Sequence, residues 1–100
     1  MVSERSIQSG IVELLRKLHW SVWDLSQPRA TLQTPGISDL VAIGRGHILF
    51  VEVKTPKGKL RESQKVFGRE VLANGGEYLI WRSVNDAWDW LVERHYIEEA

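Results

Sequence analysis

The sequence predicts an α/β fold in which helices flank a mixed β-sheet, with the elements in the order α-β-β-β-α-β-α. Segments with apolar residues at helical spacing alternate with short segments in which apolar residues recur at every second position. The segment 47–54 is mostly apolar, as expected of a central strand that is covered on both faces of the sheet. The length of 100 residues predicts one domain, 1–100.

The first predicted element is a helix at 3–18. Its apolar residues follow helical spacing and comprise Ile7, Ile11, Leu14, Leu15 and Leu18. Ser3 precedes them and is the expected N-cap residue. Glu4 and Gln8 lie one turn apart on the flank of this apolar stripe, so both can face the sheet.

A strand, a long loop and a hairpin follow the helix. The alternating segment 20–25 predicts a strand, and 26–36, which contains two prolines, predicts a loop. Two further strands, 40–43 and 47–54, are separated by Gly44-Arg45-Gly46, a sequence typical of a tight turn. The two strands therefore form an antiparallel hairpin.

The hairpin brings charged residues together. Asp39 precedes its first strand and Glu52 lies near the end of its second, so the two carboxylates are expected side by side. Successive side chains of a strand alternate between faces. One face therefore carries Ile48, Phe50, Glu52 and Lys54, and the other carries Leu49, Val51 and Val53.

Two adjacent carboxylates repel each other, and an unpaired buried charge costs several kcal/mol. A divalent cation would resolve the repulsion, and all-oxygen ligands suit a hard ion such as Mg²⁺ or Mn²⁺. Asp39 and Glu52 are the candidate ligands. Lys54 beside such an ion would orient or deprotonate an attacking water, or stabilise charge on a phosphate.

A purely structural interpretation exists for the same residues. Asp39 would be a turn residue, and Glu52 and Lys54 an ion pair on a half-exposed face. Glu-x-Lys is a short and common tripeptide, which favours this interpretation when it stands alone. The apolar strand that contains it, and the aspartate at the start of the neighbouring strand, favour a functional site instead.

The second half of the chain predicts two helices with a strand between them. The first helix should run over 61–73, with Ser63 or Thr55 helping to cap it and Asn74-Gly75-Gly76 ending it. Its expected inward residues are Val66, Phe67, Val71 and Leu72. A strand is predicted at 77–81, and the last helix at 85–93 with Ser83 or Asn85 as its cap.

The charges are balanced overall but unevenly distributed. The formal net charge is zero, which argues against nucleic-acid binding through the whole surface. The segment 54–69 carries six basic residues against one acid, whereas 86–100 carries five acids against one arginine. A basic segment that starts at Lys54 would hold a polyphosphate, and such binding weakens as salt rises. The alternative is a solvated loop and helix face.

Several classes of protein are disfavoured by composition. The chain has no cysteine, so it has no disulfide framework and no thiolate metal site, and zinc is not expected. No apolar run approaches the about 20 residues that span a bilayer, and the first residues do not form a signal peptide. We therefore expect a cytoplasmic protein.

Aromatic residues and histidines give weaker indications. The five tryptophans exceed what a small core normally absorbs, so one of them is expected at an interface. The alternative is a partly exposed tryptophan without a partner. The histidines His19, His47 and His95 show no spacing typical of metal ligands and are expected to be structural or exposed.

Asp39 followed by Glu52-Val53-Lys54 on a hairpin resembles the PD-(D/E)xK nuclease superfamily. Within it, residues 4–90 resemble a stand-alone VRR-NUC domain, the virus-type replication-repair nuclease module. The matching positions are Glu4, Gln8, Gly36-Ile37-Ser38-Asp39-Leu40, Glu52-Val53-Lys54, Gly58-Lys59-Leu60 and Gln64. Ser38 stands where the family has a proline.

The resemblance implies a metal-dependent, structure-selective endonuclease that hydrolyses DNA phosphodiesters. It implies a homodimer that cuts branched DNA such as Holliday junctions, in DNA repair. The implied catalytic residues are Asp39, Glu52, Lys54 and Gln64, and the implied ligands of Mg²⁺ or Mn²⁺ are Glu4, Asp39, Glu52 and the Val53 carbonyl. The implied substrate contacts are Gln8, Lys57, Lys59, Arg61 and Lys65.

The alternative function is a DNA-binding or dimerisation module that has the same fold but does not cleave. The presence of Asp39, Glu52 and Lys54 together argues against it, because a pure binder needs no buried pair of like charges. A sequence-specific restriction enzyme is disfavoured because 100 residues leave little protein for reading bases in a groove.

Overall fold

A computed structural model describes residues 2–26 and 35–97 of the chain. The elements in order are α1 (Glu4–Lys17), β1 (Ser21–Asp24), β2 (Leu40–Gly44), β3 (His47–Val53), α2 (Glu62–Ala73), β4 (Glu77–Trp81) and α3 (Val84–Glu93). The predicted order α-β-β-β-α-β-α is confirmed. Most of the predicted loop, 27–34, lies outside the described residues.

The four strands form one mixed sheet in the order β1-β2-β3-β4. β1 with β2 and β2 with β3 are antiparallel pairs, whereas β3 and β4 are parallel, so β3 lies inside the sheet as predicted. The β2–β3 hairpin pairs Gly44 with His47. Arg45 and Gly46, with φ angles of 51° and 82°, both adopt the left-handed conformation that the favoured two-residue hairpin turn requires.

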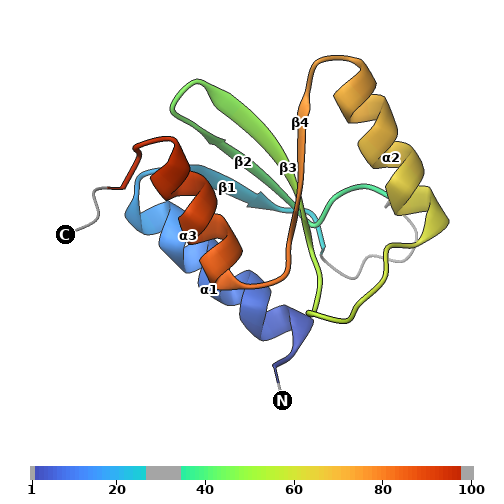
Figure 1. The fold of residues 1–100 in the computed structure, drawn as a ribbon, viewed down its shortest axis with the longest axis horizontal. Helices are drawn as coiled ribbons and strands as arrows, with labels where there is room; N and C mark the ends of the chain where they lie inside the picture. Colours follow the sequence, from blue (N-terminus) through green and yellow to red (C-terminus); the bar gives the residue numbers. More distant parts are fainter. Residues whose placement is uncertain (1, 27–34, 98–100) are drawn as a thin grey trace.

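The helices cover the sheet unequally. α1 and α3 lie on one face, which we call the core face, and α2 lies on the other, which we call the α2 face (Figure 1). The core includes Ile7, Ile11, Leu15, Trp20, Val22, Leu40, Ala42, Leu49, Val51, Val53, Trp81, Ala87, Trp90 and Leu91. Leu49, Val51 and Val53 are fully buried there, so Phe50 and Glu52 belong to the α2 face.

The caps of α1 and α3 follow the sequence closely. Ser3 caps α1 as predicted, and its Oγ accepts a hydrogen bond of 3.1 Å from the Ser6 amide. Ser83 caps α3 in the same way, accepting from the Asp86 amide at 3.1 Å. This helix therefore begins one residue earlier than predicted.

The inward face of α2 differs from the prediction. Val66 and Leu72 are exposed, at 41% and 58% of their surface, whereas Gln64 and Gly68 are buried. Gly68 is inside because α2 approaches the Tyr78 ring so closely that a Cβ at Gly68 would lie 2.7 Å from it. The contacts that position the helix are those of Gly68 with Tyr78 and of Gln64 with Glu52. A search for apolar residues at helical spacing does not detect such contacts.

The start of α2 is also fixed by a polar side chain. Arg61 is the N-cap residue, and its side chain forms no capping hydrogen bond. Gln64 Oε1 accepts from the Arg61 amide at 2.8 Å, which is one half of a capping box. Gln64 thus has the role that the sequence assigned to Ser63 or Thr55.

Three of the five tryptophans are buried in an aromatic cluster of the core. Trp20, Trp81 and Trp90 are buried and contact His47 and Tyr96 or one another. Trp23 and Trp88 remain exposed, at 63% and 38%.

His47 is a structural residue, as predicted. Its Nδ1 lies 2.7 Å from a Glu77 carboxylate oxygen, and its Nε2 lies 2.8 Å from the Tyr96 hydroxyl. In the described part of the chain, no helix is long and apolar enough to cross a membrane.

Candidate active site

The structure brings Asp39 and Glu52 together at one end of the β2–β3 hairpin. The register pairs Leu40 with Val51 in an antiparallel ladder. Asp39, which directly precedes Leu40, therefore lies across from Glu52, which follows Val51. Asp39 Oδ2 accepts a hydrogen bond of 2.8 Å from the Val53 amide, which holds the aspartate against the backbone of β3. The predicted proximity of the two carboxylates is thus present in the geometry.

Glu52 is fully buried, and both of its carboxylate oxygens have donors. Gln64 Nε2 donates to Oε1 at 3.0 Å, and the Tyr78 hydroxyl donates to Oε2 at 3.3 Å. Gln64 is itself 3% exposed and is held at its other end by the Arg61 amide. A buried carboxylate with fixed donors on both oxygens keeps one orientation.

Burial is the main reason why the pKa of Glu52 is raised from 4.5 to about 8. The hydrogen bond and the charge of Asp39 raise this pKa further, whereas the charge of Lys54 and the Tyr78 hydroxyl lower it. In the metal-free protein, the raised pKa therefore favours the protonated form of Glu52 at neutral pH. A cation placed between the two groups would displace that proton.

Tyr78 stays protonated at neutral pH and at the pH at which Glu52 ionises. Burial first, and then the neighbouring Glu52, raise the pKa of Tyr78 above its ordinary value. Its hydroxyl therefore remains a hydrogen-bond donor to Glu52. The role of Tyr78 was not predicted, because in the sequence it is one aromatic residue within a predicted strand.

Lys54 directly follows β3 and lies two residues after Glu52, on the same face of the sheet. It is 8% exposed, and its amide donates to the Trp81 carbonyl at 3.1 Å, which continues the parallel pairing with β4. Among the described residues, no carboxylate oxygen lies within 4.0 Å of its ammonium group. The ammonium is therefore near the carboxylate pair without being neutralised by a direct ion pair.

The segment before Asp39 is anchored to α2. Gly36 has a φ of +92°, and a Cβ at this position would overlap the Ser63 carbonyl. Ser38 is buried, and its hydroxyl donates to the Leu40 carbonyl at 3.1 Å. Where the VRR-NUC pattern has a proline, this chain thus fixes the backbone with a buried hydrogen bond.

Arg82 holds the loop that follows Lys54. Its Nη1 donates to the Thr55 carbonyl at 2.8 Å and to the Gly58 carbonyl at 2.6 Å. The Asp86 carboxylate accepts from the Arg82 amide at 2.8 Å. This role of Arg82 was not predicted, because the carbonyls that its guanidinium contacts are more than 20 positions away along the chain.

The basic residues predicted to contact substrate follow this loop. Lys57, Lys59, Arg61 and Lys65 are all exposed, and none forms an ion pair with another described residue. Arg69, from the same basic segment, pairs with Glu62 at 3.6 Å. The first four side chains are thus available to an anionic ligand.

Glu4 and Gln8 are placed apart from this cluster. Glu4 is exposed in the first turn of α1. In residues 2–26 and 35–97, no three His, Asp or Glu side chains are grouped so that they could hold a metal ion, so Glu4 is not gathered with Asp39 and Glu52. Gln8 Nε2 donates to Ser26 Oγ at 2.9 Å. Their predicted roles stay predictions.

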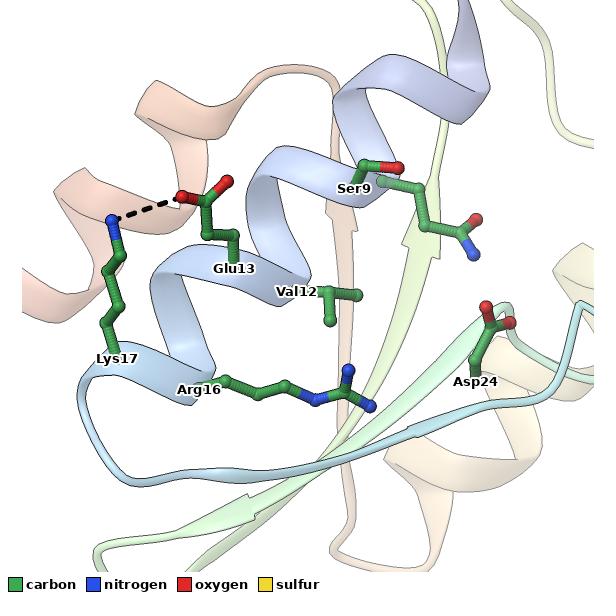
Figure 2. Close-up of a pocket in the computed structure, with 7 residues that line it drawn as sticks. Ser9, Val12, Glu13, Arg16, Lys17 and Asp24 are labelled. Atoms are coloured by element: carbon green, nitrogen blue, oxygen red, sulfur yellow. Dashed lines mark ion pairs between the residues drawn. The ribbon is translucent and has the colours of Figure 1, made fainter.

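A separate hollow of about 600 Å³ lies between α1 and β1 (Figure 2). It is lined by Gln8, Ser9, Val12, Glu13, Arg16, Lys17 and Asp24. Its charges have partners in the chain: Lys17 pairs with Glu13 at 3.1 Å, Arg16 donates to the Val22 carbonyl, and Asp24 accepts from Ser26. We therefore place the candidate site at Asp39 and Glu52 instead.

The residues at that site fit a hard divalent cation. Mg²⁺ is commonly held by one or two carboxylates, with water and substrate phosphates completing its shell. Asp39 and Glu52 supply that number, and their oxygens retain free lone pairs beside the hydrogen bonds described above. The set suits Mg²⁺ or Mn²⁺ better than an ion that needs an all-protein cage.

Comparison with known proteins found a solved structure of similar fold. A solved structure described as a VRR_NUC domain superposes with a TM-score of 0.74 at 27% sequence identity, covering 93% of this chain and 97% of its own. The fold and the family resemblance predicted from the sequence are confirmed by this match. No protein-family model and no curated protein sequence matches the chain.

Proposed function

We propose that this protein is a metal-dependent DNA endonuclease that hydrolyses phosphodiester bonds. The observation that carries the proposal is the buried Glu52 beside Asp39, with Lys54 and Gln64 next to them, on a fold similar to a VRR_NUC domain. Placing a fully buried carboxyl group beside a second carboxylate costs stability when both ionise, and a cation bound between them at a phosphoryl-transfer site would offset that cost.

Asp39 and Glu52, with the Val53 carbonyl and Glu4 as further candidates, would hold one or two Mg²⁺ or Mn²⁺ ions. When bound, such an ion polarises the phosphate and lowers the pKa of water. Gln64 and Tyr78 keep the Glu52 oxygens in one orientation, which spares the site from reorganising during the reaction. Lys54 places a positive charge where negative charge develops on the phosphate.

The substrate is proposed to be DNA that is gripped along its backbone. Lys57, Lys59, Arg61 and Lys65 are exposed and unpaired within the described chain, so they can contact phosphates beside the site. Branched DNA, including the four-way junction, is the proposed preference. A homodimer would supply the two symmetric cuts that resolving a junction requires.

The test uses end-labelled four-way junction, flap, linear duplex and single-stranded DNA with Mg²⁺ or Mn²⁺, and a chelator control. Lys54→Ala is expected to lose cutting, and Lys17→Ala, which removes an exposed lysine on α1, is its matched control. Metal-dependent, paired cuts on the junction support the full proposal. Intact DNA that still shifts on a gel supports the non-cleaving DNA-binding module in its place.

A further inference from the structure

The α2 face of the sheet continues beyond the carboxylate pair as a surface that no helix of the described residues covers. The register sets Trp23, Val41 and Phe50 side by side across β1, β2 and β3. The next row toward the hairpin turn consists of Ser21, Ile43 and Ile48. Because strand side chains alternate, both rows point to the same face as Asp39 and Glu52.

α2 covers only part of this face. Phe67 contacts the Phe50 ring, with centroids 5.5 Å apart, and Gly68 packs on Tyr78, so the helix lies over β4 and the nearer side of β3 (Figure 1). Trp23, Ile43 and Ile48 remain 63%, 41% and 57% exposed. We call these three residues the open patch.

Trp23 is the largest residue of the open patch and lies close to the candidate site. It is paired with Val41, and Asp39, which directly precedes β2, lies two residues before Val41. Diagonal neighbours of this kind are roughly 7–8 Å apart in a sheet. A nucleotide whose phosphate is held through a cation at the carboxylates can therefore reach the indole ring with its own base or a neighbouring base.

We propose that Trp23 is a stacking platform for an unpaired nucleobase of the DNA strand held at Asp39 and Glu52. The inference rests on the proposed function, and it adds a specificity-determining residue to it. An exposed aromatic ring beside a phosphate-binding region matches the way proteins hold single-stranded nucleic acid, with charges on the backbone and flat rings on the bases.

The alternative occupant, a second copy of this chain, fits the open patch less well. A standard protein interface buries about 800 Å² on each partner, far more than three partly exposed side chains provide. A protein seated on Trp23 would also crowd Asp39, one diagonal step away, and hinder substrate from reaching it. A single strand that crosses the sheet uses the patch and the site together.

Stacking on Trp23 requires a base that is free of its duplex partner. Single strands, gaps and the unpaired points of branched DNA offer such a base, whereas an intact duplex does not. Removing the ring should weaken binding of single-stranded DNA by roughly 5- to 150-fold, because stacking contributes about 1–3 kcal/mol per base. Duplex binding should change little.

The experiment measures binding by fluorescence anisotropy of labelled oligonucleotides with Ca²⁺, which also takes oxygen ligands, in place of Mg²⁺ or Mn²⁺, and a gel run in parallel checks that the DNA stays uncut. The proteins are the wild type, Trp23→Ala, Trp23→Phe and Trp88→Ala, the last as a control for an exposed tryptophan elsewhere, on α3. The DNAs are a single strand, the same strand with one abasic site moved along it, and a duplex. Thermal melts check that every variant is folded.

The proposal expects Trp23→Ala to lose single-strand affinity, Trp23→Phe to recover part of it, and Trp88→Ala to match the wild type. It also expects one abasic position to weaken wild-type binding but not Trp23→Ala binding. Equal single-strand affinity of the wild type and Trp23→Ala would overturn it, and so would a dimer that becomes a monomer in Trp23→Ala on sedimentation.

These outcomes are separate from failure of the proposed function. A wild type that cuts DNA and binds single strands as well as Trp23→Ala does refutes stacking and leaves the nuclease proposal standing. A wild type that binds single strands through Trp23 but cuts no DNA with Mg²⁺ or Mn²⁺ refutes the nuclease and keeps the stacking site. A wild type that binds no DNA refutes both.

Discussion

Glu52→Gln is expected to stabilise the metal-free protein at high pH while removing its response to metal. The folded protein holds a proton on Glu52 up to a pKa of about 8, whereas the ordinary value of 4.5 applies to the unfolded chain. Between these two pH values the native state binds one proton more than the unfolded state. The free energy of unfolding therefore falls as the pH rises through this window.

The magnitude follows from the size of the pKa shift. Each unit corresponds to about 1.4 kcal/mol, so the full shift of Glu52 corresponds to roughly 5 kcal/mol of lost stability above pH 8. Below pH 4.5 the loss is absent. The total stability of a small domain is about 5–15 kcal/mol, so this loss is large. A neutral amide of nearly the same shape can keep the Gln64 hydrogen bond and avoids the loss.

The assay is urea unfolding at pH 5.5 and 8.5 in chelator, followed by tryptophan fluorescence. The wild type should lose several kcal/mol between the two pH values, and Glu52→Gln should lose much less. Glu70→Gln makes the same change at an exposed position of α2 and should follow the wild type. Adding Mn²⁺ at pH 8.5 should restore the wild type, because the cation favours the ionised pair, and should leave Glu52→Gln unchanged.

One result would refute this reasoning directly. If the wild type is equally stable at both pH values in chelator, Glu52 ionises without a penalty and the carboxylate pair is not under electrostatic stress. If Glu52→Gln is no more stable than the wild type at pH 8.5, some other group accounts for the pH dependence.

Three further predictions concern the supports of the site. Gly36→Ala should lower the free energy of unfolding by about 2 kcal/mol or more in urea melts, because it combines a positive φ with a clash at Ser63. The control Gly75→Ala, with a φ of +80° and open space around it, should lower it by about 1 kcal/mol. Equal losses would show that the clash does not contribute. Arg82→Ala should free the loop after Lys54 and raise KM for DNA more than it lowers kcat, and unchanged cleavage kinetics would show that the loop needs no such anchor. Lys59→Ala should weaken DNA binding and reduce the slope of log K against log salt by about one, and an unaltered slope would exclude a phosphate contact at this residue.

The hairpin and its carboxylates could be predicted because their determinants are local. Alternation along β3 assigned Glu52 to its face, and the short turn at Arg45 and Gly46 fixed the register that brings Asp39 beside it. The predicted central position of β3 follows from its apolar composition. Nothing in this part of the site depends on residues far away in the sequence.

The remaining contacts of the site depend on how distant elements meet. Tyr78 reaches Glu52 only because β4 joins β3 in parallel, with Phe50 opposite it, and the sequence does not specify that register. The inward residues of α2 were mispredicted for a related reason. Periodicity favoured Val66 and Leu72, but the helix packs through Gly68 and Gln64, which carry no hydrophobic signal.

The features that break ordinary folding rules coincide at one place. Glu52 is fully buried beside a second carboxylate. Gln64, at an inward position of α2, donates a hydrogen bond to it, and the almost fully buried Lys54 acts on it through its charge. A protein that only bound DNA could carry an amide at this position and be more stable without metal. Local conflict with stability is expected where a site is built for a ligand, and the divalent cation proposed above would turn this conflict into a stabilising interaction.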